Sequence, residues 1–285
     1  RMAAGGIHDH IGGGFHRYSV DARWLVPHFE KMLYDNASLA AVYLEAHRIT
    51  ANDSYRRVAV STLDYVLREM TDPGGGFYSS QDADAAGIEG HYYLWTPAEV
   101  EAVLEPDEAR LFARCYGITA RGNFEGKTIL HEPAPLAEFC ASNHLDPAAF
   151  ELQLDSWKKK LLASRARRPA PTRDDKIIAG WNGLMISSFA QAGARLGEPR
   201  FVAAAERAAG FVLTRMALDH DLLHSWTASR ATIPGYLDDY AAMSVACLDV
   251  YNATGNTHWV READRLARRM LEEFGDSSGG LRFSA

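Results

Sequence analysis

The stretch that decides the fold is residues 34–70, which read YDNASLAAVYLEAHRITANDSYRRVAVSTLDYVLREM. Two further copies follow without a gap when this stretch is moved along the chain by 146 and by 204 residues. Small side chains then meet small ones, as where Ala59 meets Ala205 and Ala263. Self-similarity of this kind is typical of repeat architectures. The sequence therefore predicts an array of repeated units.

Each copy is expected to form a pair of helices. Apolar residues at helical spacing predict helices over about 35–50 and 55–70, joined by a turn at 51–54. The matching turns at 197–200 and 255–258 contain Gly, Pro and Asn, which end one helix and start the next. Each repeat is therefore a helical hairpin.

The segment between the first two copies is less regular but also mostly helical. Helices are expected near 107–116 and 147–166, and short strands at 77–80 and 91–95 on either side of an acidic loop. The full prediction is one domain over residues 1–285 with about four hairpins, near 34–70, 97–168, 181–217 and 237–274. Long, aromatic and glycine-rich connections favour a closed α/α toroid over an open solenoid. The predicted fold class is all-α, with short β-hairpin insertions.

Composition limits the function classes. The chain has 285 residues, 47% of them hydrophobic and 24% charged, which is typical of a globular protein. A net charge of -7 argues against a protein that binds nucleic acid. No apolar run approaches the roughly 20 residues of a membrane span. Three widely spaced cysteines argue against a disulfide framework or a zinc cluster. We expect a small-molecule ligand, no cofactor, no metal and a cytoplasmic location, although a signal peptide upstream of Arg1 would not be visible.

Polar chemistry concentrates in four connections, over 5–34, 71–96, 169–182 and 218–240. These connections follow an outer helix and precede the next inner helix. In a toroid they would lie on one rim beside the N-termini of the inner helices. This arrangement predicts a shared central pocket suited to anionic or hydroxyl-rich ligands.

The first connection is rich in groups that transfer protons. Four histidines lie among Asp9, Arg17, Glu30 and Asp35. The alternative is that its glycines serve a tight loop and that its histidines cap helices or fill polar pockets. A zinc site is disfavoured because no His-x-x-x-His spacing is present.

The other connections add carboxylates and one aromatic pair. The acidic loop after 80 resembles a calcium loop, but Ala86 and Tyr93 occupy two of the ligand positions, so that interpretation fails. Its carboxylates either contact sugar hydroxyls or form a solvated turn. Trp181 and Asn182 suit stacking and hydroxyl contacts, with structural packing as the alternative. The arginines near residue 165 are interpreted as a solvated helix end, and Asp239 falls at the repeat position of Asp35.

These connections supply the candidate site residues. The candidate catalytic residues are His16, His28, Glu30, Asp35, Asp82, Asp84 and Asp239. The candidate substrate-binding residues are His8, Arg17, Asn36, Glu89, Asp175, Lys176, Trp181, Asn182, Asp238 and Tyr240.

Five ordered motifs resemble one family, the thioredoxin-domain proteins related to spermatogenesis-associated protein 20. They include residues 12–18, GGGFHRY, and residues 28–36, HFEKMLYDN. The others are Asp82 to Asp84 with Glu89-Gly90 and Trp95, Asp174 to Lys176 with residues 181–184, WNGL, and Leu237 to Tyr240. The resemblance covers essentially the whole chain.

The resemblance implies a fold more than an activity. Family members look like a thioredoxin-like domain followed by an (α/α)6 toroid of the six-hairpin glycosidase and N-acylglucosamine epimerase type. We therefore expect this chain to be an incomplete toroid, without the thioredoxin part, that exposes apolar hairpin faces. It also implies a sugar-like ligand and, as a partner, a thioredoxin-like domain.

Two classes of function remain open. The first is a carbohydrate-processing pocket. In its epimerase or isomerase form, His16 or His28 removes a proton beside a carbonyl, Glu30 or a second histidine returns it, and Arg17 stabilises the enolate oxygen. In its hydrolase form, two acids among Asp35, Asp82, Asp84 and Asp239 cleave a glycosidic bond. The second class is a non-catalytic ligand-binding or scaffold module that works with a thioredoxin-like domain.

Overall fold

The computed structural model describes residues 1–219 and 221–284. Helices dominate and the strands are short, which confirms the prediction of an all-α fold with small β-hairpins. The chain divides into two compact units. Unit 1 is Arg1–Lys31 with Gln81–Thr172, and unit 2 is Met32–Ser80 with Arg173–Ala285. The single domain expected over residues 1–285 stays a prediction.

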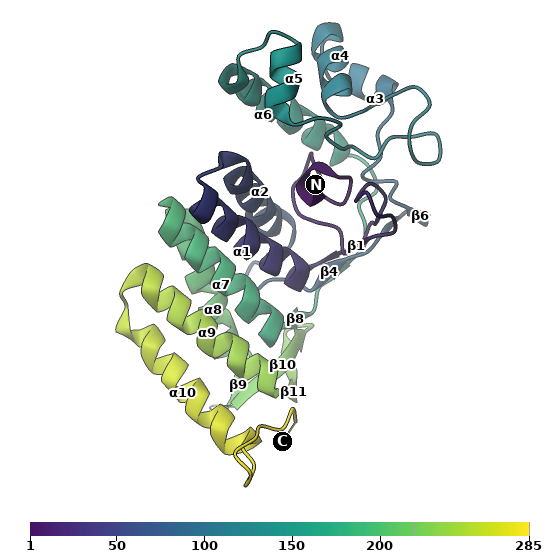
Figure 1. The fold of residues 1–285 in the computed structure, drawn as a ribbon. Coiled ribbons are helices and arrows are strands. Elements are labelled where there is room, and N and C mark those ends of the chain that lie inside the picture. Colours follow the sequence, from purple (N-terminus) through teal and green to yellow (C-terminus); the bar gives the residue numbers. More distant parts are fainter. Residues whose placement is uncertain (220, 285) are drawn as a thin grey trace. The chain divides into compact units, whose positions relative to one another are not determined.

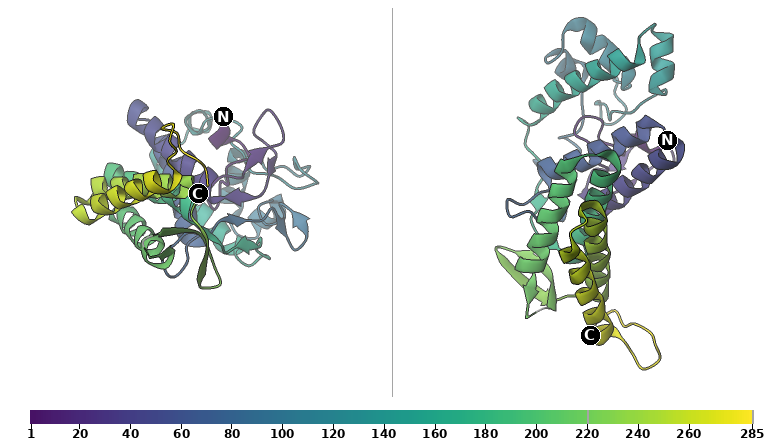
Figure 2. Two further views of the ribbon diagram at one scale, coloured as in Figure 1. Left: turned by 90° about the horizontal axis from the view of Figure 1, so that it is seen from below. Right: turned by 90° about the vertical axis from the view of Figure 1, so that its left-hand side faces the viewer.

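Unit 2 is built from the three predicted helical hairpins (Figure 1). They are α1 (Leu33–Thr50) with α2 (Asp53–Glu69), α7 (Ala179–Leu196) with α8 (Pro199–Arg215), and α9 (Leu237–Thr254) with α10 (Thr257–Phe274). The first helices of the hairpins, α1, α7 and α9, lie side by side. Figure 2 shows the pairing of α9 and α10 from two further directions. The helix bounds agree with the predicted ones to within two residues.

The core of unit 2 explains the difference between the two helices of each hairpin. The outer helices α2, α8 and α10 have one buried stripe, to which Leu63, Phe201 and Leu266 belong. The inner helix α7 lies between α1 and α9 and buries residues around most of its circumference, whereas α1, with fewer neighbours, buries one stripe. Burial of the outer stripe against the inner helices therefore holds each hairpin together.

The repeat is also visible at the helix ends. Helices α1, α7 and α9 each end in a left-handed residue at the same repeat position: Ala51 (φ 52°), Gly197 (φ 67°) and Gly255 (φ 70°). Asn52 and Asn256 then cap α2 and α10 by accepting a hydrogen bond from a backbone N–H two residues on. The same chemistry thus ends and restarts the helices in different copies.

Unit 1 contains the irregular segment predicted over 97–168. Its helices are α3 (Pro97–Glu101), α4 (Pro106–Cys115), α5 (Leu136–Ser142) and α6 (Pro147–Arg165), preceded by the 3-10 helix Met2–Ala4. A capping box between Thr96 and Glu99 starts α3. Phe112 of α4 and Trp157 of α6 meet in a core that also holds Leu161.

The short strands differ from the prediction. Residues 91–95 form a turn that ends in a bridge between Trp95 and Thr128, so the strand predicted there is wrong. The hairpin lies instead inside the acidic loop, where β5 (Asp84–Ala85) pairs with β6 (Ile88–Glu89) across a tight two-residue turn. Unit 1 also contains β1 (Tyr18–Ser19) and β2 (Pro27–His28). Strands β3 (Lys31–Met32) and β4 (Ser80–Gln81) lie where the chain passes from one unit to the other.

Unit 2 has a small sheet next to its helices. Its strands are β8 (Ile177–Ile178), β9 (Ala217–Leu218), β10 (Asp221–Thr227) and β11 (Arg230–Pro234), and β7 (Arg173–Asp174) lies outside this sheet. Strand β10 pairs with β8, β9 and β11, all antiparallel. In Figure 1 these strands lie at the ends where α7 and α9 begin. Among the described residues, no helix combines the length and the apolarity needed to cross a bilayer.

Candidate functional site

Two short strands of unit 1 bring the first group of candidate residues together. Strands β1 and β2 pair so that Tyr18 lies opposite His28, and the two rings stack with their centroids 4.9 Å apart. The ladder continues where the Arg17 N–H donates to the Glu30 carbonyl. The Arg17 guanidinium also donates to the Glu30 carboxylate, with Nη1 2.8 Å from Oε2. Cross-strand pairing therefore positions all four side chains.

His28 lies between two carboxylates. Its Nδ1 is 3.1 Å from Oε1 of Glu89, and its Nε2 is 3.9 Å from Oε2 of Glu30. Glu89 reaches it from β6 of the acidic hairpin. We call Arg17, Tyr18, His28, Glu30 and Glu89 the His28 cluster. About a third of the His28 side chain is exposed (32%), so the cluster is accessible to a ligand.

The cluster combines three chemical capacities. An imidazole held by carboxylates can accept and return a proton. A guanidinium can stabilise an oxygen that gains negative charge. The exposed Tyr18 ring offers an apolar face beside these polar groups. Asp82 and Asp84 are exposed on the same acidic hairpin, and Asp84 is the cross-strand partner of Glu89.

Behind these strands unit 1 buries a group of charged side chains that were not among the candidates. Asp9 accepts two hydrogen bonds from Arg165, at 2.8 and 2.9 Å, and one from Lys31 Nζ at 2.9 Å. All three side chains are nearly inaccessible to water. Burial alone would raise the pKa of Asp9, but Arg165 and Lys31 outweigh it and hold that pKa well below its usual value.

The interpretation of Arg165 as part of a solvated helix end is therefore wrong. Its guanidinium pairs with a carboxylate 156 positions away and lies over the Tyr92 ring, 4.8 Å from the centroid. Gly12 makes room for this pair, because a Cβ atom there would lie 2.0 Å from Arg165 Nη2. Arg168 is also held, by the carbonyls of Tyr92 and Leu94.

Two candidate histidines lie inside this buried region. His16 is 2% exposed, and its Nδ1 is 2.8 Å from the Phe29 carbonyl. Burial, helped by nearby Lys31, lowers the pKa of His16 to about 3, so its ring is neutral near pH 7. His8 is also buried, and among the described residues neither of its ring nitrogens has a hydrogen-bond partner. Both rings line an internal cavity of about 10 Å³, the size of roughly one water molecule.

In unit 2, three candidate residues share one repeat position and bind backbone. The Asn182 amide is fully buried, donates to the carbonyls of Phe77 and Ile178, and accepts from the Phe77 N–H. Asn36 donates to the Met32 carbonyl in the same way. The Tyr240 hydroxyl accepts from the Leu222 N–H. Asn36 and Asn182 thus hold the starts of α1 and α7, and Asn182 and Tyr240 also tie down connecting segments.

Asp239 is fully buried at the start of α9. It accepts hydrogen bonds from the backbone N–H groups of Gly180 and Tyr236, and its Oδ2 lies 2.8 Å from Nδ1 of His224. Burial raises the pKa of Asp239, partly offset by these hydrogen bonds. Sequence inspection missed His224, because a single histidine in a connection carries no spacing signal.

The remaining candidates of unit 2 are spread over its surface. Trp181 is half-buried and meets the Tyr34 ring edge-on, with centroids 4.7 Å apart. Asp35 is half-buried at the equivalent position of the first hairpin. Asp175 pairs with Arg173, Lys176 pairs with Asp174, and Asp238 is exposed in the first turn of α9.

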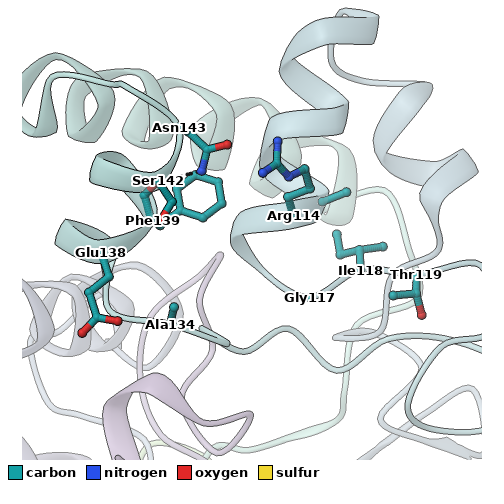
Figure 3. A pocket seen from close by; sticks show the side chains of 10 residues that line it. Arg114, Gly117, Ile118, Thr119, Ala134, Glu138, Phe139, Ser142 and Asn143 are labelled. Atoms are coloured by element: carbon teal, nitrogen blue, oxygen red, sulfur yellow. Dashed lines mark hydrogen bonds between the residues drawn. The ribbon is translucent and has the colours of Figure 1, made fainter.

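Unit 1 has a cavity beside α4 and α5 (Figure 3). It measures about 440 Å³ and opens between Arg114 at the end of α4 and Glu138, Phe139 and Asn143 at α5. None of the predicted site residues lines it. In the part of the chain that the structure describes, no three His, Cys, Asp or Glu side chains are grouped to hold a metal ion.

Comparison with known proteins identifies relatives of nearly the whole chain. No protein-family model matches it. Human spermatogenesis-associated protein 20 is 38% identical over 99% of this chain, and an uncharacterised protein of Caenorhabditis elegans is 31% identical over 98% of it. The chain spans about 40% of the length of these curated relatives.

One solved structure shares the fold. It is a UGL variant with dGlcA-Glc-Rha-Glc, which is 11% identical, has a TM-score of 0.55, and is matched over 98% of this chain and 56% of that chain. At this identity the likeness concerns the fold alone. It agrees with the predicted fold class, the six-hairpin α/α toroid.

Proposed function

We propose, for a chain that belongs to the spermatogenesis-associated protein 20 family, that the His28 cluster binds a carbohydrate and transfers a proton on it. The observation that carries the proposal is the position of His28, stacked on Tyr18 and flanked by the carboxylates of Glu30 and Glu89. The fold shared with a solved structure that contains a sugar chain supports the ligand class.

The reaction that suits the cluster best is epimerisation or isomerisation of a sugar. His28 takes the proton from the carbon beside the carbonyl, and the electron pair of that C–H bond moves to the carbonyl oxygen. Arg17 stabilises the resulting enolate oxygen. His28 then returns this proton to carbon, directly or by way of the Glu30 carboxylate 3.9 Å from its Nε2, which restores the protonation state of the enzyme. Tyr18 supplies the ring face against which the sugar packs.

His28 is preferred over His16 as the group that moves the proton. The His16 ring is 2% exposed and its Nδ1 is taken by a backbone carbonyl, whereas the His28 ring is open to solvent. A group that accepts a proton from substrate must come within hydrogen-bond reach of it. His16 instead lies next to Phe29 and Tyr93, where it supports the strand that carries His28.

A hydrolase is the second candidate, because Asp84 faces Glu89 across the acidic hairpin and both are exposed. Two carboxylates on opposite sides of a glycosidic bond are the usual machinery of glycosidases. The third candidate is a module that binds a ligand without turnover and works with a thioredoxin-like domain. The mutual pairing of Arg17 with Glu30 suits such a binding role as well.

Solvent-hydrogen exchange tests the proposal. The protein is incubated in D₂O with free glucose, mannose, N-acetylglucosamine and cellobiose, and NMR follows deuterium entry at the carbon beside the carbonyl. We expect exchange with at least one sugar, slowed about 100-fold or more in His28→Gln. His144→Asn, which changes an exposed histidine of unit 1, serves as the control and should leave the rate unchanged.

The outcomes separate the three candidates. Cleavage of an oligosaccharide without exchange, lost in Asp84→Asn, would favour the hydrolase. Sugar binding in a calorimeter that weakens in Arg17→Gln but not in Arg23→Gln, with no turnover, would favour the binding module. Neither exchange, cleavage nor binding would contradict the carbohydrate proposal altogether.

A further inference from the structure

A second imidazole–carboxylate pair lies in unit 2, between β10 and the start of α9. The side chain of His224 points from β10 toward Asp239, with Nδ1 2.8 Å from Oδ2. A carboxylate can only accept at this contact, so Nδ1 carries the proton and Nε2 keeps its lone pair in the neutral ring. The pair thus selects the tautomer in which Nε2 is the basic nitrogen.

Hydrogen bonds hold the Asp239 carboxylate in the position from which it orients His224. Its Oδ1 accepts from the Gly180 N–H at 2.7 Å, and its Oδ2 accepts from the Tyr236 N–H at 2.9 Å as well as from His224. These donors come from the first turn of α7 and from the N-cap of α9, where helix dipoles favour negative charge. The carboxylate is therefore ordered from three sides, and it cannot contact a ligand because its side chain is fully buried.

His224, by contrast, is open on one side. About a quarter of its side chain (24%) is exposed, and the edge of its ring meets Tyr236 with centroids 5.0 Å apart. Within residues 1–219 and 221–284, the His224 ring makes one hydrogen bond, from Nδ1 to Asp239. Nε2 is thus the nitrogen left to meet a ligand.

The arrangement exceeds what helix capping requires. Asp239 already completes a capping box with Tyr236, whose backbone N–H it accepts. The additional partner is an imidazole, about a quarter exposed and held in one tautomer, which is the arrangement that orients a general base in the Ser-His-Asp triad. Asp239 was a candidate catalytic residue, and its burial makes it a positioning residue instead.

We propose that His224 is a further proton-transfer residue of this protein, oriented by Asp239, that acts on a hydroxyl of a sugar-like substrate. The substrate class rests on the proposed function, whereas the imidazole–carboxylate pair stands on the geometry of unit 2 alone. Nε2 takes the hydroxyl proton, the electron pair stays on the substrate oxygen, and the imidazolium is stabilised by the Asp239 carboxylate. The same nitrogen returns the proton, so no other reactant is consumed.

The first test is spectroscopic and needs no substrate. Long-range ¹H–¹⁵N NMR of the protein, with the His224 signals assigned by their loss in His224→Gln, should show Nδ1 protonated and Nε2 bare in the neutral ring. In Asp239→Asn the amide NH₂ can donate to Nδ1, so the proton should move to Nε2. An Nε2-protonated ring in the wild-type protein would overturn the proposal.

Chemical modification covers the case in which Asp239→Asn does not fold. An unprotonated, accessible ring nitrogen attacks diethyl pyrocarbonate and is carbethoxylated, and mass spectrometry of wild-type protein locates the adducts. We expect His224 to react at least as fast as His258, which is exposed on α10 in the same unit. If His224 stays unmodified while His258 reacts, Nε2 is not available and the proposal fails.

Activity measurements distinguish failure of the His224 proposal from failure of the proposed carbohydrate function. In the exchange and cleavage assays, at least one reaction on a sugar should slow about 100-fold in His224→Gln and stay unchanged in His258→Gln. Full activity in His224→Gln, with loss in His28→Gln, would overturn the role of His224 and keep the carbohydrate function. No reaction in the wild-type protein, together with the expected tautomer and modification, would contradict the function and keep the imidazole–carboxylate pair.

Discussion

The histidines of unit 1 divide into two kinds by their exposure. His8, His10 and His16 are buried, whereas a third of the His28 side chain is exposed. Burial makes a charged imidazole costly, and it lowers the pKa of His10 and of His16 to about 3. The buried rings therefore stay neutral near pH 7 and serve the structure, whereas solvent reaches the His28 ring.

This burial predicts how stability depends on pH. In the unfolded chain these histidines gain a proton near pH 6.5, but in the folded chain His10 and His16 do so only near pH 3. The unfolded state therefore binds more protons in between, and the free energy of unfolding falls as the pH is lowered from about 6.5. Each such histidine contributes up to about 1.4 kcal/mol per pH unit.

Urea denaturation at pH 7, 6, 5 and 4.5 measures this dependence. In His16→Gln the slope between pH 6 and 4.5 should be shallower by about 1.4 kcal/mol per pH unit. His258→Gln, at an exposed site, should keep the wild-type slope. Equal slopes in wild type and His16→Gln would show that the buried ring is already protonated in the folded protein.

Individual residues show where sequence inspection succeeds and where it fails. The histidines and acids of the first connection are grouped in the sequence itself, so the region of His28 could be proposed as a site from local pattern alone. The partnership of Asp9 with Arg165 was not predictable, because 156 positions separate the two and no local pattern links them. His224 was missed for the same reason, since only the path of β10 brings it to Asp239.

At the scale of elements, the repeat fixes the ends of the inner helices. Ala51, Gly197 and Gly255 adopt the left-handed conformation that ends α1, α7 and α9. A side chain makes this conformation unfavourable by roughly 1–2 kcal/mol, so glycine is the better residue there. The first hairpin is the one that departs from this rule.

We therefore expect Ala51→Gly to raise the free energy of unfolding by about 1 kcal/mol, as measured by urea denaturation. The matched reverse changes, Gly197→Ala and Gly255→Ala, should lower it by a similar amount. No atom lies within 4 Å of a Cβ placed at either glycine, so backbone strain alone decides the effect. A loss of stability in Ala51→Gly would contradict this account of the helix ends.

The elements themselves divide into predictable and unpredictable ones. The three hairpins of unit 2 follow from apolar spacing and from Gly and Asn at the turns, which are local signals. The hairpin of β10 and β11 was not predicted, because its turn at Ala228 and Ser229 has none of the Asn-Gly or Asp-Gly signals that mark such turns. The strand predicted at 91–95 was wrong, because its aromatic residues pack into the core of unit 1 instead of pairing in a sheet.

At the scale of the whole molecule, candidate residues occur in both units. Unit 1 carries the His28 cluster, and unit 2 carries the pair of His224 and Asp239. The convergence of four connections on one pocket, which the toroid fold led us to expect, stays a prediction. The fold class and the family follow from the repeat and from the motifs, whereas the chemistry depends on long-range contacts that emerge only in the structure.

The most direct test of the central claim is a crystal structure of the protein with a bound sugar. We predict that the sugar packs on Tyr18, with a hydroxyl or carbonyl oxygen within hydrogen-bond distance of His28 or Arg17. A sugar bound instead in the cavity between Arg114 and Phe139, or away from the His28 cluster altogether, would contradict the account.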